Sequence, residues 1–260
     1  MKISLIVTTY NWPEALRLSL ESVKRQTRMP DEVIVADDGS GEETRKLVEE
    51  MRRGFPCPLY HSWIPDKGFR IALSRNEAVS RYSTGDYLIF IDQDIILDRH
   101  FVADHEAMAE RGCFVAGGRV KLLPELTKRL THGEICHLGI FTQGLARRVN
   151  IIHALWLHPL TQYLYCWKPL YGRGANMAVW RDDFYKTNGF DNRLNGYGVD
   201  DTDLFNRLLN MGVRKRYAQF CAICYHLYHP RDKVVANNCK IAFGSNSRRT
   251  FCPNGLTTMK

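Results

Sequence analysis

Short apolar runs alternate with amphipathic stretches along the first half of the chain. The apolar runs have the length of buried strands, and they lie at 3–7, 32–36, 59–63 and 87–91. Between the first two, Leu16, Leu20 and Val23 recur at helical spacing behind Pro13, which suits the first turn of a helix. Further helices are predicted at about 42–53 and 71–82. This alternation predicts an α/β fold with a mostly parallel central sheet flanked by helices.

The second half of the chain has a looser pattern. Strands are predicted at 114–120 and 174–180, and helices after Asp182 and from about Asp200 to Met211, whereas 124–170 is irregular and rich in aromatics. We find no repeat or clear linker, so we expect a single domain over 1–235. It would have a nucleotide-binding half (1–112) and an acceptor-binding half (113–235), followed by a C-terminal extension (236–260).

Three acidic clusters interrupt this pattern. Asp37-Asp38 and Asp92-Gln93-Asp94 each follow a predicted strand, where the carboxyl ends of parallel strands form ligand sites. An Asp-x-Asp at such a place holds a hard divalent cation, which we expect to be Mn²⁺ or Mg²⁺. Taken alone, the pair is equally compatible with a solvated turn.

The third cluster, Asp200, Asp201 and Asp203, opens a predicted helix. One of two adjacent acids can cap the helix while the other faces a cleft and accepts a proton from an incoming hydroxyl. A metal site, a nucleotide site and a base together describe group transfer from an activated donor to an alcohol.

Four motifs in this order resemble glycosyltransferase family 2 on a GT-A (Rossmann-like) fold: VTTYN, VIVADDGS, GDYLIFIDQD and GYGVDDTDLFNRL. The part from GRGANMAVWRDDF to CYHLYHPRDK is similar to the galactosyltransferase-type C-terminal region. The resemblance covers about residues 1–235. It implies an inverting transfer of a sugar from a nucleotide-sugar, with UDP as the expected nucleotide, to a glycan or lipid-linked acceptor in cell-surface polysaccharide or lipopolysaccharide assembly.

The resemblance also implies roles for individual residues. The expected nucleotide-binding residues are Thr8, Tyr10, Asp37, Asp38, Arg70, Asn76 and Asp92. Asp94 would be the direct metal ligand, completed by either His226 or His229. Asp201 would be the catalytic base. Asp200 stands where the family usually has Glu and would hold the acceptor, with Gly198 and Trp180 also on the acceptor side.

A zinc site is a competing interpretation of the late histidines. Cys221, Cys224, His226 and His229 have a compact ligand spacing. The surrounding FCAICYHLYH, however, alternates like a buried strand, which would place the two cysteines on opposite faces. We therefore favour reduced, buried thiols.

The net charge of +8 suits anionic partners. No basic stripe or basic–aromatic repeat predicts nucleic-acid binding, and no apolar run is long enough to span a bilayer. The strand-like start argues against a signal peptide, so we expect a cytoplasmic protein, with peripheral contact at the inner face of the membrane as an option. That contact would use the basic and aromatic residues Arg147, Arg148, Trp156, Leu157, Tyr163, Leu164, Tyr165 and Trp167.

Two other functions compete with glycosyl transfer. A nucleotidyltransferase shares the α/β architecture but needs a glycine-rich, basic diphosphate loop, which VTTYNWPEALR lacks. A non-catalytic nucleotide-sugar-binding relative is the second alternative, and the intact acidic clusters argue against it.

Overall fold

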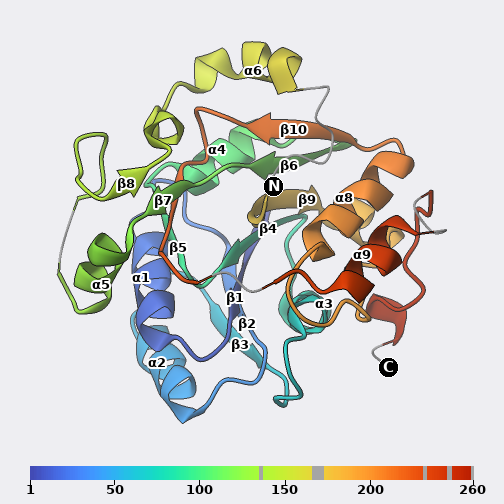
Figure 1. The fold of residues 1–260 in the computed structure, drawn as a ribbon, viewed down its shortest axis with the longest axis horizontal. Helices are drawn as coiled ribbons and strands as arrows, with labels where there is room; N and C mark the ends of the chain where they lie inside the picture. The colour runs from blue at the N-terminus through green and yellow to red at the C-terminus, as the bar shows by residue number, and fades with distance from the viewer. Residues whose placement is uncertain (135–136, 166–172, 231–232, 245–247, 259–260) are drawn as a thin grey trace.

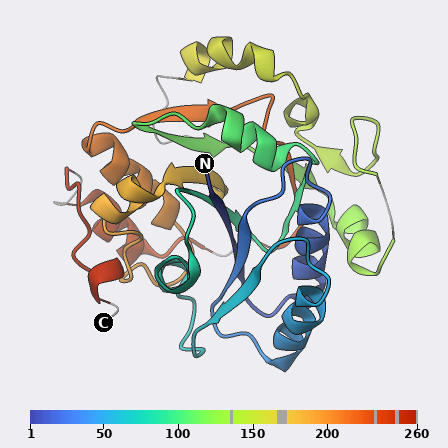
Figure 2. The ribbon, with the colours of Figure 1, turned by 180° about the vertical axis from the view of Figure 1, so that it is seen from behind.

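The computed structural model describes residues 1–134, 137–165, 173–230, 233–244 and 248–258, and within them the strands form two sheets (Figures 1 and 2). The larger sheet has the spatial order β10 (Arg214–Ala218), β6 (Cys113–Gly117), β9 (Arg173–Trp180), β4 (Tyr87–Asp92), β1 (Ile3–Thr9), β2 (Glu32–Asp37) and β3 (Leu59–Trp63). Within it β9 runs antiparallel to both neighbours, and the other pairs are parallel. The predicted mixed, mostly parallel sheet is therefore confirmed.

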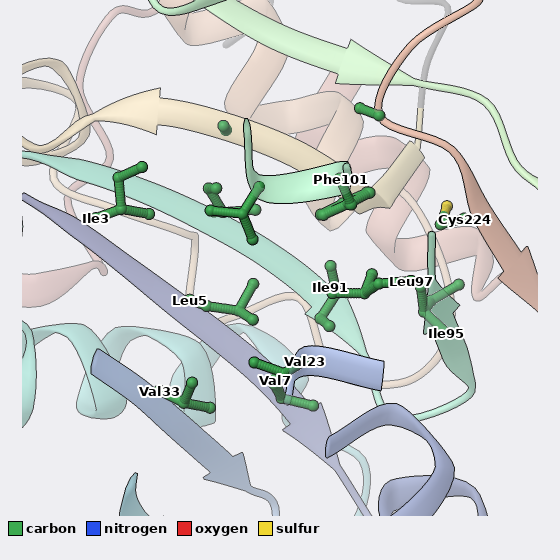
Figure 3. Packing of buried hydrophobic residues seen from close by; sticks show 14 of the residues in the cluster. Ile3, Leu5, Val7, Val23, Val33, Ile91, Ile95, Leu97, Phe101 and Cys224 are labelled. Atoms are coloured by element: carbon green, nitrogen blue, oxygen red, sulfur yellow. The ribbon is translucent and has the colours of Figure 1, made fainter. Parts of the chain in front are cut away.

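Helices cover both faces of this sheet. The helices α1 (Pro13–Val23), α2 (Glu42–Arg52) and α4 (Phe101–Met108) pack on one face, and α3 (Ile71–Tyr82), α7 (Arg181–Lys186) and α8 (Asp200–Asn210) pack on the other. Figure 3 shows Ile3, Leu5 and Val7 of β1 within the first of these layers. Ile6 points into the second layer. Because both faces are covered, the strands appear in the sequence as nearly continuous apolar runs.

A smaller sheet continues directly from β4. Its order is β5 (Ile95–Leu97), β11 (Cys224–His226), β7 (Val120–Leu122) and β8 (Leu145–Ala146). The helix α5 (Pro124–Thr131) packs on it through Leu126 and Leu130. Since only Gln93 and Asp94 separate β4 from β5, they occupy the corner where the chain passes from one sheet to the other.

The stretch predicted to be irregular thus contributes regular elements. Besides α5 and β8 it forms the short helices η1 (Arg148–Ile151) and η2 (Leu155–Leu157), followed by α6 (His158–Tyr165). These elements are too short for a hydrophobic period to be recognised in the sequence. The remaining elements are α9 (Ala236–Phe243) and η3 (Leu256–Thr258). Among the helices of the described ranges, none is long and apolar enough to cross a bilayer.

The register of the parallel strands gathers the first two acidic clusters at one end of the large sheet. Thr8 of β1 lies opposite Asp92 of β4, and Thr9 lies opposite Asp37 of β2. Gln93 links the strand ends, because its side-chain oxygen accepts from the Thr9 hydroxyl at 2.5 Å and from the Tyr10 N–H at 3.1 Å. The Asp-Gln-Asp interruption of the core strand is therefore where the sheet ends and the site begins.

Candidate functional site

Asp94, His226 and His229 converge beside the small sheet. Antiparallel pairing of β5 with β11 sets His226 opposite Ile95, the residue after Asp94. One carboxylate oxygen of Asp94, Oδ2, lies 3.1 Å from Nε2 of His226 and 3.2 Å from Nε2 of His229. One potential ligand atom from each of the three residues lies within 4.8 Å of the others. The sequence left the two histidines as alternatives, and the structure brings both to the same carboxylate.

The surroundings of this cluster fit a divalent cation. Burial alone would raise the pKa of Asp94, but hydrogen bonds from His226 and His229 hold it well below its usual range. The same carboxylate raises the pKa of His229. The other oxygen of Asp94, Oδ1, is buried and has no hydrogen-bond partner among the described residues. A buried carboxylate oxygen without a partner is costly, and a cation would satisfy it.

The Arg75 side chain lies between Asp92 and Asp200, which belong to different acidic clusters. It projects from α3 and is fully buried. Its Nε donates to the Thr8 hydroxyl at 2.9 Å, and its two terminal nitrogens donate to Asp92 at 2.7 Å and Asp200 at 2.5 Å. Two of the acids that the motifs singled out therefore share one guanidinium.

This pairing separates the two acids of Asp-x-Asp. Asp92 faces Arg75, whereas Asp94 faces the two histidines. Burial raises the pKa of Asp200 to about 6, with Arg75 lowering it and the neighbouring Asp201 and Asp92 raising it. Arg75 is thus the cation that compensates for placing several carboxylates close together.

Asp201 is the second residue of α8 and is held in one orientation. Its Oδ1 accepts from the backbone N–H of Thr202 at 2.7 Å, and its Oδ2 accepts from the N–H of Gly174 at 2.7 Å. Oδ1 also accepts from the Thr202 hydroxyl at 3.1 Å, so the free lone pair of this partly exposed side chain is on Oδ2. Before it, Gly198 has a φ of +106°, and a Cβ there would lie 3.0 Å from Val234. Glycine at 198 therefore allows the turn that presents Asp201.

A second group of residues surrounds the ends of β1 and β2. Asp38 is buried, its Oδ2 accepts from the N–H of Arg70 at 2.5 Å, and its Oδ1 has no partner in the described residues. Burial raises the pKa of Asp38 to about 6, although the Arg70 N–H lowers it. Tyr10 is exposed, and its hydroxyl donates to Asp66 at 3.0 Å. Asp38 thus has a free oxygen that could accept from, or if protonated donate to, a base edge.

A family model described as glycosyl transferase family 2 matches residues 4–180. The chain belongs to glycosyl transferase family 2. A second model, described as the N-terminal domain of galactosyltransferase, matches residues 161–230, which include α8 and both histidines. The two matches cover every acidic cluster of the site.

Two curated proteins similar to this family-2 chain are named glycosyltransferases. The O-antigen chain rhamnosyltransferase RfbN of Salmonella typhimurium is 38% identical over 101 residues, which is 37% of this chain and 29% of that protein. The validoxylamine A glucosyltransferase of Streptomyces hygroscopicus subsp. limoneus is 26% identical over 233 residues, or 81% of this chain and 48% of that protein. The chain therefore spans less than half the length of either relative.

Solved structures show the fold. A mannosyltransferase, PcManGT from Pyrobaculum calidifontis, in complex with GDP-Man and Mn²⁺, aligns with a TM-score of 0.60 at 18% identity over 88% of this chain and 58% of that one. S. aureus TarS in complex with UDP-GlcNAc aligns with a TM-score of 0.58 at 18% identity over 91% of this chain and 61% of that one. The fold of this family-2 member is GT-A.

Trp180, predicted to lie on the acceptor side, is remote from the acidic clusters. Because β9 is antiparallel to β4, Trp180 lies opposite Tyr87, at the end of β4 remote from Asp92. Asp92 is five positions further along β4 than Tyr87, and this length of strand spans about 17 Å. Its indole N–H donates to the carbonyl of Glu110 at 2.8 Å. Trp180 is therefore a core residue at the opposite end of the sheet.

Two predicted nucleotide-binding residues have structural roles instead. Asn76 is fully buried; its amide group donates to the carbonyl of Phe190 and to Asn192, both at 2.8 Å, and its oxygen accepts from the Phe190 N–H. Asp37 is fully buried as well. It accepts from the N–H of Ser40 at 2.8 Å and lies 2.7 Å from Nε2 of His61. The polar atoms of both side chains therefore have partners within the protein, unlike the free oxygen of Asp38.

The cysteines do not join the histidine cluster. Cys221 lies 3.2 Å from the sulfur of Met108, and the thiol of Cys224 lies 3.6 Å from the side chain of Asn176. Burial raises the pKa of each thiol to about 12, which opposes the thiolate form that zinc requires. In the described ranges, the group that could hold a metal is Asp94 with the two histidines.

Sequence reasoning missed Arg75, although a signal for it exists. Ala72, Arg75 and Val79 recur at helical spacing, so Arg75 lies on the apolar face of its helix. An arginine placed on a buried face needs carboxylate partners, and the acidic clusters provide them.

Proposed function

We propose that the chain transfers a sugar from a UDP-sugar, with inversion, to a hydroxyl of a glycan or lipid-linked acceptor in cell-surface polysaccharide or lipopolysaccharide assembly. It would work in the cytoplasm, at the inner face of the membrane. The convergence of Asp94, His226 and His229 on one point is the observation that carries the proposal. The UDP-GlcNAc complex of TarS supports the donor class, and the O-antigen rhamnosyltransferase supports the acceptor class.

Asp94, His226 and His229 would hold the divalent cation. When bound, the cation would neutralise the donor diphosphate and stabilise it as the leaving group. Two imidazole nitrogens favour Mn²⁺ over Mg²⁺, which prefers oxygen ligands. The Mn²⁺ in the PcManGT complex agrees with this choice.

The acidic residues of α8 would act on the acceptor. Asp201, held by the N–H groups of Thr202 and Gly174, would accept the proton of the acceptor hydroxyl as that oxygen attacks the anomeric carbon. Asp200, fixed by Arg75, would orient the acceptor sugar beside it. Asp38, with its free oxygen, would bind the base of the nucleotide.

A screen for donor hydrolysis tests this function. The protein is incubated with individual UDP-sugars and GDP-sugars and Mn²⁺, and release of the nucleoside diphosphate is measured. We expect release from at least one UDP-sugar, and none after EDTA treatment or in the Asp94→Ala variant. Binding of UDP without any release would instead identify a non-catalytic relative. Release that survives EDTA would contradict the metal-dependent mechanism.

A further inference from the structure

We propose that the segment from Gly139 to Leu160 is a docking face for an anionic lipid bilayer. In the described ranges its Phe141 (92% exposed) and Trp156 (80%) are the most exposed of the large apolar side chains. Further side chains exposed along the same segment are Ile140, Val149, Ile152 and Leu160. Exposed aromatic and aliphatic groups on one segment mark an interaction surface rather than ordinary surface residues.

These side chains point outward from a segment that is firmly attached. Ile151 and Leu155 pack against the hydrophobic cores, while Ile152 and Trp156, each one residue further on, face solvent. His153 lies 2.9 Å from the buried Asp104, and the N–H of Ala154 donates to Phe220 at 2.7 Å. The exposed side chains are therefore presented on a fixed backbone.

The loop that carries Phe141 is held to the same segment. The guanidinium of Arg148 donates to the carbonyls of Ile140 at 3.0 Å and Thr142 at 3.1 Å. Figures 1 and 2 show this loop, η1, η2 and α6 along one outer rim, on the side of the molecule away from α9. A flat partner could contact this rim without touching α9.

The positive charge of the segment indicates that its partner is anionic. The sequence has no Asp or Glu between Gly139 and Leu160, whereas this stretch contains Arg147 and Arg148. Both arginines are exposed. Apolar and aromatic side chains among cations, with no acids, match the interface of a bilayer that contains anionic lipids. A second copy of this chain, at a net charge of +8, would repel the same surface.

The face also adjoins the candidate metal site. His226 of β11 pairs with Lys121 of β7, which in turn pairs with Ala146 of β8. Two strand spacings, about 10 Å, therefore separate His226 from the start of the basic segment at Arg147. If the proposed function holds, a lipid-linked acceptor embedded in the bilayer would meet the protein next to its cation.

Vesicle co-flotation tests the face without requiring any activity. The wild-type protein, a Phe141→Ser/Trp156→Ser double variant and a Phe251→Ser control, exposed at 47% elsewhere, are mixed with phosphatidylglycerol-containing or pure phosphatidylcholine vesicles. We expect wild type and control to bind the anionic vesicles alone, less so at high salt, and the double variant to bind at least about tenfold more weakly.

Three outcomes overturn the proposal: no binding of the wild type to anionic vesicles, equal binding to both lipids, or full binding by the double variant. The proposal is also overturned if the wild type does not bind lipid but sediments as a dimer, and the double variant sediments as a monomer. That result would identify a second copy of the chain as the occupant of the face. UDP release from a soluble donor is measured on the same samples, so failure of the proposed function is seen separately.

Discussion

At the scale of single residues, Arg75 joins the two sides of the site. Its guanidinium is 2% exposed and contacts Asp92 and Asp200, which are 30% and 16% exposed. Two carboxyl groups are tolerated close together there because the guanidinium compensates their loss of hydration. Removal of the cation would leave two partly buried carboxylates close together without a partner.

The Arg75→Met variant should therefore lower the free energy of unfolding by about 2–4 kcal/mol. Urea denaturation measures the loss. Arg17→Met is the matched control, because Arg17 pairs with Glu50 at 3.0 Å in solvent, and we expect it to cost about 0–1 kcal/mol. Adding Asp200→Asn to Arg75→Met should recover part of the loss. Equal stability of the two arginine variants would refute a buried charge network.

At the scale of elements, Asn76 fastens α3 to the loop that precedes α8. Three hydrogen bonds join its amide to Phe190 and Asn192. A glycine at 189 makes this possible, since a Cβ there would lie 2.4 Å from the Asn76 oxygen and the φ is +70°. This contact sets where α8 starts, and so the position of Asp201.

We predict that Asn76→Ala lowers the free energy of unfolding by about 2–3 kcal/mol, because buried partners lose their hydrogen bonds. Its affinity for UDP should stay within about twofold of the wild type, since we assign Asn76 no ligand contact. Asp38→Asn is the opposite control, expected to weaken UDP binding at little cost in stability. Thermal unfolding and calorimetric UDP titration on both variants measure these effects. A larger loss of UDP affinity in Asn76→Ala than in Asp38→Asn would contradict the roles assigned to these two residues.

The positions of the long elements and the mostly parallel sheet could be predicted from the sequence, and the direction of β9 could not. Buried strands such as Tyr87–Asp92 and the helix Asp200–Asn210 have clear apolar patterns. The pattern of β9 does not reveal that it runs antiparallel, and the wrong placement of Trp180 follows from that. The short strands β5 and β11 depend on pairing with each other rather than on local preference, so tertiary contacts decide them.

The positions of the site residues could be predicted where a sequence motif lies at the end of a strand. Asp38 directly follows β2, Asp92 is the last residue of β4, and Asp94 lies two residues further on, all at the expected edge. The choice between His226 and His229 could not be made, because both reach Asp94 only once β11 pairs with β5. Asp37 has the same sequence context as Asp38, yet it is turned inward to hold its own loop.

At the scale of the whole molecule, the C-terminal extension packs on the domain where it is described. The N–H of Cys252 donates to Thr187 at 3.0 Å, and the N–H of Leu256 donates to Asn188 at 3.0 Å. Arg249 contacts Asp191 at 3.0 Å and Asp203 at 2.5 Å. The extension therefore supports the loop before α8, and the described residues form one connected body around the site.

The most direct test of the whole account is metal-dependent binding of UDP, measured by calorimetry on the wild type, Asp94→Ala and Asp201→Asn. We predict that the wild type binds UDP with Mn²⁺ and weakly without it. Asp94→Ala should lose about tenfold or more of that affinity, since it removes a ligand of the cation. Asp201→Asn should bind UDP as the wild type does while transferring no sugar. UDP binding by Asp94→Ala that equals the wild type with Mn²⁺ would contradict the assignment of the metal site.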